Sequence, residues 1–594
     1  MGSANPIPSG AGEYSSIHSA IAIKQRDDGS YSDTPATLDG VTIDNVTVED
    51  SANGLRFGEP GVDYSGEPDG PTDVTITDST FENNDRYHIE DLPNSTTLED
   101  VRNQGQNDFD RVVLTDVGIY SSIDAATSTV ESNDTIAVES GVYNESVSVD
   151  TSNVTIQGAG DGTTINGSVA LSASETTLSD VQVNTSIGDV FPNPVDENNA
   201  INVGGNNASV EDATVNAQGN ADSYLEAVGI EITADDVVVS ESNVSVNVMD
   251  GSGDGAVGVS IGTASANGSA DIIGNNISAT SSGYSFATVT RGDGSSASIY
   301  LNELKASGEA DDLDGVGFGI EDQAAAADQD VKYNNFAKVD TIEHKTDSGA
   351  LDMRLNRWEN IGGVEFIEGN GDIVYDPVLT TSIDNVDPES PSSIREYGSV
   401  LELESDGTRA LAVGFSAPPD ETAAEVFDDL NVTGNAFTYE SGTGYQSVDG
   451  EFTPTAGEVI VITTDDEGID EDVVIPVDAV PDDESGVPTE VQVENGWNLV
   501  ATGAADDPNN IDYALGGTGS ISSTQWLQER PDQPGVATES TYGAFDGTWV
   551  YVDGSGSISP GYGSGQTPFQ YEGEVLYPAG QYPDELADQV DEDE

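Results

Sequence analysis

Histidine is the first residue type in this sequence that could support catalysis or bind a metal ion. The chain has three histidines, His18, His88 and His344, and they lie far apart in the sequence. A histidine metal site or a Ser-His-Asp triad would therefore require distant segments to converge. We interpret the three as surface histidines, so they predict no catalytic residue.

Acidic glycine-rich segments are the second candidate for chemistry. The segments DGSGDG and EGNGDIVYD bring together two pairs of carboxylates, Asp250 with Asp254 and Asp372 with Asp376. Hard cations prefer such oxygen ligands, although neither segment follows the EF-hand pattern. The sequence therefore predicts Ca²⁺ or Na⁺ as the only candidate cofactors, at these four aspartates.

Asn-x-Ser/Thr sequons are frequent. The chain has twelve of them, and eleven lie before residue 382. A sequon marks a candidate site of N-glycosylation, although strands rich in Ser and Thr with Asn turns also generate the motif by chance. The candidate glycosylated residues are Asn45, Asn144, Asn153, Asn184, Asn243 and Asn276.

Aromatic residues gather near the C-terminal end of the chain. Such residues most often fill a small core, and the alternative is a surface that stacks on a glycan or contacts a partner. The candidates for glycan or partner binding are Tyr445, Trp497, Trp526, Trp549 and Tyr551.

The charge balance is extreme, because 110 Asp and Glu residues stand against 16 Lys and Arg, for a formal net charge of −94. Nucleic acid is excluded as a partner, since binding needs basic residues that neutralise phosphates. Self-repulsion of this size opposes folding, yet 35% of the residues are apolar and recur periodically. The two facts are compatible in molar salt, where the Debye length falls to about 3 Å. We therefore expect a folded, halophilic protein.

Two features of the sequence bear on membrane insertion and export. No apolar run reaches the roughly 18 residues of a membrane-spanning helix, so no direct membrane span is expected. The opening segment MGSANPIPSGAGEYSSIHSA lacks the basic and apolar regions of a secretory signal. We expect either that a signal has been removed or that the protein leaves the cell within a virus particle. There is no cysteine to form a disulfide.

The strand-like segments that would carry these residues recur at a fixed interval along the chain. The segments NNAINV, AVGIEI, AVGVSI, SFATVT and GVGFGI begin at 198, 227, 256, 285 and 315, so the step is 29 residues three times and then 30. A second strand-like piece lies between successive segments. Val, Ile and Thr alternate with polar residues, and Gly, Asn, Asp and Ser bound the runs. This pattern predicts the turns of a parallel β-helix.

The period also predicts the organisation of the chain. It ends at SIDNVDPESPSSIREYGS, where Pro and Ser mark a linker. The predicted parts are a short or incomplete β-helix unit at 1–116, the main β-helix at 117–380, a linker at 381–399, β-rich modules at 400–478 and 479–578, and an acidic tail at 579–594.

A resemblance supports this organisation. Residues 119–183 resemble the entry of pectin-lyase-like right-handed β-helix proteins, including the NosD-like periplasmic copper-site accessory family, in which a short amphipathic helix caps the first coil. Asn133 departs from that family, which usually has Gly there. The matching residues are Ile123, Ala125, Ala126, Asp134, Thr135, Ile136, Val138, Gly141, Tyr143, Glu145, Val147, Val149, Val154, Ile156 and Gly158.

The resemblance extends to the far end, where ALDMRLNRWENIGG and GNGDIVYDPVLT are similar to the closing coil of that family. The terminal modules, through ENGWNLVATGA and FDGTWVYVDG, resemble a β-rich domain often appended to haloarchaeal surface proteins. The expected fold is all-β: a right-handed parallel β-helix, or solenoid, followed by two small β-rich modules. In the first coils we expect Ile136, Val138, Val147, Val149, Val154 and Ile156 to face inward and Asp134, Glu139, Glu145 and Asp150 to face solvent.

Relatives with this fold include polysaccharide lyases, hydrolases and methylesterases, but a fold alone does not establish an activity. Lyases of this class need a basic group beside a Ca²⁺-bound uronate, and no Arg or Lys lies between Arg111 and Arg291. We interpret Arg291, Arg354 and Arg357 as surface charges near a loop or the end cap. Carboxylate pairs carry little information in a chain this acidic. Whether the protein is an enzyme stays open, and the residues favour a non-enzyme.

The leading hypothesis is a non-catalytic structural and adhesive surface protein of a halophilic archaeon or of its virus. It would form a homo-oligomer, for example a trimer, or a larger assembly with cell-envelope or virion proteins and surface glycans. A genuine start at Met1 favours a virion spike or tail fibre that attaches to the host, and a processed chain favours an envelope protein. The alternative is an envelope polysaccharide lyase or glycoside hydrolase.

Overall fold

The computed structural model describes most of the chain up to residue 383 and the strands beyond it. The described ranges are 19–23, 38–57, most of 71–188, 199–220, 226–248, 255–308, 315–321, most of 324–383, and the strands with some adjoining residues between 397 and 558. The chain divides into two compact units. The first comprises Met1–Val331, Phe336–Leu351 and Glu365–Ile373, and the second comprises Lys332–Asn335, Asp352–Val364 and Val374–Glu594.

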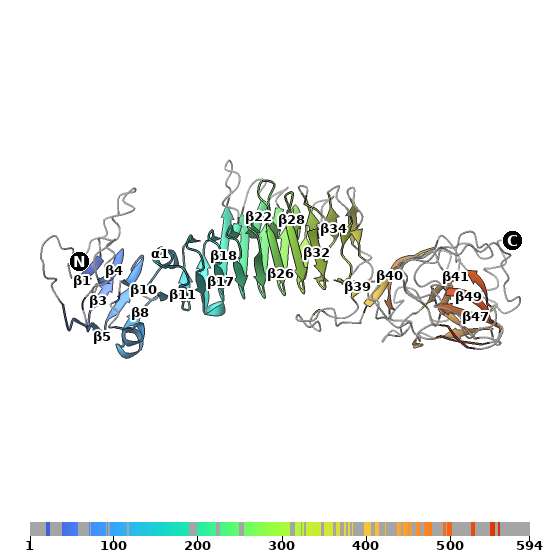
Figure 1. Cartoon of the computed structure of the whole chain (residues 1–594), viewed down its shortest axis with the longest axis horizontal. Helices are drawn as coiled ribbons and strands as arrows, with labels where there is room; N and C mark the ends of the chain where they lie inside the picture. Colours follow the sequence, from blue (N-terminus) through green and yellow to red (C-terminus); the bar gives the residue numbers. More distant parts are fainter. Residues whose placement is uncertain are drawn as a thin grey trace. The chain divides into compact units, whose positions relative to one another are not determined.

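Three stacked parallel sheets form the main part of the first unit, and each coil contributes one strand to each sheet (Figure 1). The first sheet contains β11 (Thr135–Val138), β14 (Thr155–Gln157), β17 (Thr177–Ser179), β20 (Ser209–Glu211), β23 (Val237–Ser240), β26 (Ser269–Ile273), β29 (Ser296–Tyr300) and β32 (Gln329–Lys332). The second contains β12 (Gly141–Tyr143), β15 (Thr163–Asn166), β18 (Gln182–Gly188), β21 (Thr214–Asn220), β24 (Asn243–Val248), β27 (Asn276–Ser281) and β30 (Glu303–Ser307). The third contains β13 (Val147–Val149), β16 (Val169–Leu171), β19 (Asn199–Val203), β22 (Glu226–Ile232), β25 (Gly255–Ile261), β28 (Tyr284–Thr290), β31 (Gly315–Ile320), β34 (Thr341–His344) and β37 (Glu365–Glu368).

This architecture confirms the predicted right-handed parallel β-helix. The 29-residue period is the length of one coil, because Ile201 pairs with Ile230 and Ile230 with Val259 in successive strands of the third sheet. The six residues predicted to face inward in the first coils are 2% exposed or less. Each such aliphatic side chain contributes about 1.5–3 kcal/mol on burial. Regular alternation thus builds one continuous apolar interior.

The start of this stack is capped as the resemblance implied. Helix α1 (Ile123–Thr127) begins after Ser122, whose side chain accepts a hydrogen bond from the Ala125 backbone N–H. Glu145 also accepts backbone N–H bonds from Ile123 at 2.9 Å and from Asp124 at 3.2 Å. The prediction that Glu145 faces solvent was therefore wrong, because this carboxylate satisfies amides that the first helical turn leaves without partners.

Of the other three acidic residues predicted to face solvent, one is exposed and two are partly exposed. Asp150 is exposed, whereas Asp134 and Glu139 are half-buried. Glu139 forms an ion pair with Arg102, which comes from the preceding segment. The predicted departure at Asn133 also has a structural reason, since its φ of 80° is left-handed. Glycine adopts that conformation without strain, and Asn is among the few other residues that tolerate it.

Buried asparagines line a turn between the first and second sheets. Asn275 donates from Nδ2 to Oδ1 of Asn302 at 3.0 Å, and its own Oδ1 accepts the Ser242 backbone N–H at 2.9 Å. These side chains are 0–2% exposed. The ladder satisfies backbone groups that the turn would otherwise bury without partners.

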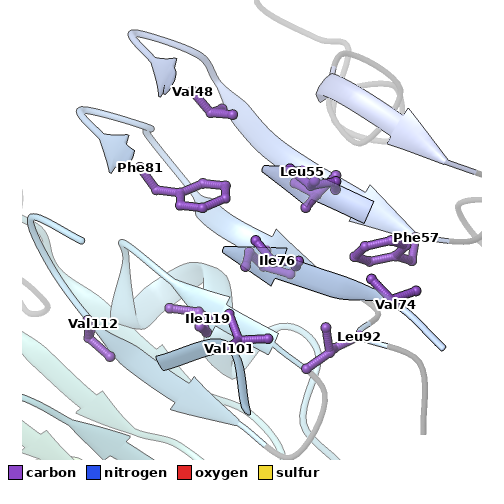
Figure 2. Close-up of a cluster of buried hydrophobic side chains, with 12 residues drawn as sticks. Val48, Leu55, Phe57, Val74, Ile76, Phe81, Leu92, Val101, Val112 and Ile119 are labelled. Carbon is purple, nitrogen blue, oxygen red and sulfur yellow. The ribbon is translucent and has the colours of Figure 1, made fainter. Parts of the chain in front are cut away.

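Shorter coils precede the main stack. Their strands are β1 (Ser19–Ile23), β2 (Thr42–Asp44), β3 (Thr47–Glu49), β4 (Asn53–Phe57), β5 (Thr75–Thr77), β6 (Thr80–Glu82), β7 (Tyr87–Glu90), β8 (Asp108–Phe109), β9 (Val113–Thr115) and β10 (Gly118–Tyr120), with a π-helical turn at Asp100–Gln104. Parallel pairs β1–β4, β4–β7, β2–β5 and β3–β6–β8 make the coils. Figure 2 shows their buried cluster, in which Leu55, Phe57 and Phe81 are fully buried.

The strand direction reverses where these coils meet the main stack. Strand β10 pairs antiparallel with both β7 and β9, and β9 pairs antiparallel with β11. The first sheet is therefore continuous through the first unit, but its parallel ladder is interrupted once.

The second unit contains antiparallel sheets. The strands of these sheets are β39 (Val378–Leu379), β40 (Tyr397–Ser405), β41 (Ala410–Gly414), β42 (Ala436–Glu440), β43 (Gly444–Val448), β44 (Val459–Thr463), β45 (Ile469–Val477), β46 (Val491–Val493), β47 (Gly496–Ala501), β48 (Thr524–Gln528), β49 (Gly547–Val552) and β50 (Gly556–Ile558). The short strand β36 (Arg357–Trp358) belongs to the same sheet as β30 and is not one of them. Short strands β33 (Asn335–Phe336), β35 (Leu351–Asp352) and β38 (Ile373–Val374) span the boundary between the two units in the sequence. Strands β41-β44-β42-β43 form one sheet and β47-β49-β48 another, and the division into modules at 400–478 and 479–578 stays a prediction. No helix within the described residues is long and apolar enough to cross a membrane.

Candidate functional site

The third sheet of the main stack is bent, and the bend creates the candidate site. Gly229 and Gly258 point into the interior, since an added Cβ would lie 2.6 Å from Val244 Cγ1 and 2.3 Å from Ile277 Cγ2 respectively. The next residues, Ile230 and Val259, are also fully buried. Two successive inward residues break the alternation of a flat strand. An extra inward residue of this kind bends the strand locally.

A strip of apolar side chains lies on the outer side of this sheet. It packs together in a cluster separate from the core of the N-terminal coils, with Tyr284 against it. An added Cβ on Gly319 would lie 2.6 Å from Phe286, so this glycine leaves room for the Phe286 ring. The strip consists of Val228, Val257, Phe286, Val289 and Val316, all 3% exposed or less.

Arg291 closes this strip with a buried ion pair. Its Nη1 lies 2.7 Å from Oε1 of Glu226 and its Nη2 lies 3.0 Å from Oε2, so the contact is bidentate. Arg291 Nε also donates to Glu321 at 3.1 Å, and the Tyr284 hydroxyl donates to Glu226 at 2.7 Å. The Arg291 side chain is 13% exposed. The interpretation of Arg291 as a surface charge was therefore wrong.

Protonation in this cluster is fixed by the ion pair. Burial alone would raise the pKa of Glu226, but the charge and hydrogen bonds of Arg291 outweigh it and lower that pKa. Burial and the Glu226 charge raise the pKa of Tyr284. Burial opposes the charge on Arg291, yet Glu226 and Glu321 raise its pKa overall. At neutral pH the cluster therefore holds a carboxylate, a guanidinium and a neutral phenol.

Lys345 extends the same cluster to the next coil. Its Nζ lies 2.5 Å from Oε1 of Glu343 and 3.4 Å from Oε1 of Glu321. Burial raises the pKa of the fully buried Glu343 and Glu321 adds to the rise, whereas Lys345 acts in the opposite direction. We call Glu226, Tyr284, Arg291, Glu321, Glu343 and Lys345 the Arg291 cluster.

The Arg291 cluster resembles a catalytic constellation only in its residue types. A general acid or base needs a pKa near the working pH and an open path to a substrate proton. Both oxygens of Glu226 accept hydrogen bonds from Arg291, and three nitrogens of Arg291 contact carboxylates. The charged groups of Glu226 and Arg291 are therefore already engaged in contacts within the cluster. The arrangement acts as a brace that joins β22, β28 and the segments after β31 and β34.

The other arginine candidates lie in the second unit. Arg354 pairs with both oxygens of Asp352, at 2.9 and 3.0 Å, and Arg357 donates to Asn335 at 2.9 Å. Both arginines are half-buried. Each one is engaged locally, so neither supplies a free cation to a site.

The prediction of surface histidines was wrong for two of the three. His88 and His344 are fully buried, and His18 lies outside the described residues. His88 Nδ1 lies 3.1 Å from Asn84 Nδ2, and Nε2 lies 3.0 Å from Oδ1 of Asp110. Burial lowers the pKa of His88 to about 4 although Asp110 acts in the opposite direction. A neutral ring that accepts from Asn84 at Nδ1 and carries its proton on Nε2, close to Asp110, fits this environment.

The predicted cation ligands Asp250, Asp254, Asp372 and Asp376 all lie outside the described residues. Among the residues that the structure does describe, no group of three or more His, Asp or Glu side chains could hold a metal ion. Ca²⁺ or Na⁺ binding at the four aspartates stays a prediction.

The predicted aromatic residues lie on strands of the terminal modules. Tyr445 is in β43, and the other four are in the sheet β47-β49-β48. In that sheet Trp497 is paired with Tyr551, whereas Trp526 is paired with Val550. Trp549 is paired with both Leu499 and Leu527. The register thus brings Trp497 and Tyr551 together, and binding by this group stays a prediction.

The predicted glycosylation sites differ in exposure. Asn153 and Asn184 are half-buried, whereas Asn45, Asn144, Asn243 and Asn276 are exposed. The sequence did not predict that Glu226, Tyr284 and Glu321 would lie together around Arg291. One signal could have indicated them, because Arg291 is the first basic residue after Arg111 and an isolated cation in so acidic a chain needs partners.

Comparison with known proteins adds the following. No protein-family model matches the sequence, and no curated protein matches it. Among solved structures, the enzymatically active domain of tailspike protein 2 from bacteriophage CBA120 matches at 9% identity and a TM-score of 0.23, over 74% of this chain and 78% of that one. Pectin methylesterase PemA from Erwinia chrysanthemi matches at 13% identity and a TM-score of 0.18, over 36% and 77%. The pectin methylesterase from Aspergillus niger matches at 15% identity and a TM-score of 0.21, over 44% and 84%. The strand pairing described above, rather than these similarities, defines the fold as a parallel β-helix.

Proposed function

We propose that the protein is a non-catalytic structural and adhesive protein on the surface of a halophilic archaeon or of its virus. In this role the stack of coils is a spacer, and the parts at its ends attach to a virion, an envelope or a host glycan. The trimer or larger assembly expected from the sequence belongs to the same proposal, with cell-envelope or virion proteins and surface glycans as partners.

One observation carries the proposal. Among the described residues of the main stack, the Arg291 cluster brings basic, acidic and phenolic groups together, and these groups pair with one another. Among the described residues, the interior of the main stack is filled mostly by apolar side chains. The acidic composition supports exposure to brine, since screened carboxylates keep a protein hydrated and soluble there.

A polysaccharide lyase or hydrolase is the competing function, and Arg291 is the observation that favours it. Carboxylates do surround an arginine on one face of the stack, as such an enzyme would require. The bidentate pairing with Glu226 and the lowered pKa of that carboxyl argue against it, because a carboxylate with both oxygens paired and a lowered pKa is a poor general acid or base.

The proposal is tested by immunogold labelling of intact cells and of purified virus particles, together with an assay for unsaturated or reducing sugar ends released from host envelopes. We expect label on the cell or virion surface and no sugar release. A signal confined to the cytoplasm would refute the surface role. Sugar release by the purified wild-type protein would establish the enzyme instead.

A further inference from the structure

The outer face of the second sheet differs from the rest of this acidic chain. The strands β12, β15, β18, β21, β24 and β27 contain no Asp, Glu, Lys or Arg. The chain as a whole carries 110 acidic residues. Outward positions on these strands hold Asn, Gln, Ser and Thr almost throughout, and charge returns only in β30 with Glu303 and Lys305.

Five sequons fall on this uncharged face. Asn144, Asn166, Asn184 and Asn216 occupy one column across successive coils, and all but Asn216 begin a sequon. Asn243 and Asn276 begin the other two, and they are directly paired on β24 and β27.

Hydrogen bonding separates these asparagines into two groups. Asn166 Nδ2 donates to Asn144 Oδ1 at 2.8 Å, and Asn184 Nδ2 donates to Asn166 Oδ1 at 3.4 Å. Asn216 Nδ2 in turn donates to Asn184 Oδ1 at 3.0 Å. The ladder therefore uses the nitrogens of Asn166 and Asn184, whereas Asn144 takes part only through its oxygen.

The side-chain nitrogen is the atom that N-glycosylation modifies. Sugar replaces one of the two hydrogens on Nδ2, so on Asn166 or Asn184 it would compete with the ladder hydrogen bond and crowd the neighbouring asparagine. Asn144, Asn243 and Asn276 are exposed, and within the described residues their Nδ2 atoms make no hydrogen bond. These three can carry a glycan with the folded face unchanged.

We propose that the outer face of the second sheet is the glycosylated face of the protein, with N-linked glycans on Asn144, Asn243 and Asn276 and none on Asn166 or Asn184. Elsewhere carboxylates keep the surface hydrated, and this face lacks them. Bulky, neutral sugar chains supply that hydration and keep two uncharged faces from associating. The inference rests on the proposed surface function, because glycosylation requires export.

The test is glycopeptide mass spectrometry of the protein purified from its producing cells, with a matched pair of variants. Ser146→Ala removes the sequon of Asn144, and Ser168→Ala removes that of Asn166, while both asparagines stay in place. We expect nearly full occupancy at Asn144, Asn243 and Asn276, the loss of one glycan in S146A and no loss in S168A. Each variant removes the 3.2 Å contact between the two serines, and Ser146→Ala also removes the acceptor of the Ser168 backbone N–H at 3.3 Å.

Two results would overturn the inference: sugar on Asn166 or Asn184, or an unmodified Asn144, Asn243 and Asn276 in protein recovered from the surface. In the second case, sedimentation of wild type and of Asn276→Arg would show whether the uncharged face binds a second copy instead. A protein found only inside cells would refute the proposed function itself, which the location experiment detects separately.

Discussion

At the scale of single residues, the molecule keeps its few cations close to carboxylates. The Glu226–Arg291 pair is one enclosed example, with side-chain exposures of 29% and 13%. Lys305 and Glu303 illustrate the opposite case, since their side chains are 33% and 38% exposed. Pairs of these two kinds contribute differently, because removal of one partner from a buried pair leaves an uncompensated charge.

Arg291→Met is expected to lower the free energy of unfolding by about 3 kcal/mol, because Glu226 would then be a buried carboxylate without its cation. The double variant Glu226→Gln with Arg291→Met should recover part of that loss. Urea denaturation at constant salt measures both. Lys305→Met is the control and should change stability by less than about 1 kcal/mol. Equal losses for Arg291→Met and Lys305→Met would contradict the brace.

His88 makes stability depend on pH in a defined window. Its pKa is lowered from an ordinary 6.5 to about 4 in the folded chain, chiefly by burial. Between these values the unfolded chain binds more protons at this residue, so its contribution to stability is present above pH 6.5 and is lost as the pH falls toward 4. His88→Gln should therefore lose less stability than wild type between pH 7 and pH 5, as measured by denaturant unfolding. An unchanged pH dependence in the variant would rule this out.

At the scale of elements, strand alternation and the coil length could be predicted from the sequence, and the bend of the third sheet could not. The repeat segment AVGIEI, residues 227–232, shows why. Ala227, Ile230 and Ile232 fit an ordinary alternation only if one residue is skipped, and Gly229 is that residue because it has no side chain to place. Contacts such as Glu226 with Arg291 join residues 65 positions apart through this bend. Local sequence patterns do not show which residues so far apart in the chain lie close together in space, so the Arg291 cluster could not be predicted.

Gly258→Ala tests the bend. The added Cβ would lie 2.3 Å from Ile277 Cγ2 and 2.5 Å from the Ala287 carbonyl oxygen, and the backbone atom cannot move easily. We expect a loss of about 1–3 kcal/mol in unfolding free energy. Gly204→Ala is the matched control, since its nearest neighbours would be 3.9 Å away. A Gly258→Ala variant as stable as Gly204→Ala would show that the strand does not need its glycine.

At the scale of the whole molecule, net charge should decide where the protein folds. A formal charge of −94 repels itself over a Debye length of about 10 Å at 0.1 M salt but only about 3 Å at 1 M. The thermal midpoint, followed by circular dichroism, should therefore rise steadily with KCl concentration over this range. Equal effects of KCl and NaCl are expected from screening alone. A midpoint independent of salt would refute the halophilic interpretation.

The reversal of strand direction between β7 and β11 has a consequence for a molecule under tension. Among the described residues, β7 and β10 are joined through two residue pairs and β9 and β11 through two, whereas β22 and β25 are joined through six. A load applied along the stack is borne by every interface in series, so the one with the fewest hydrogen bonds yields first. If the protein tethers one body to another, pulling would peel the N-terminal coils away and leave the remaining coils folded, and rejoining would require only the re-pairing of two short strands.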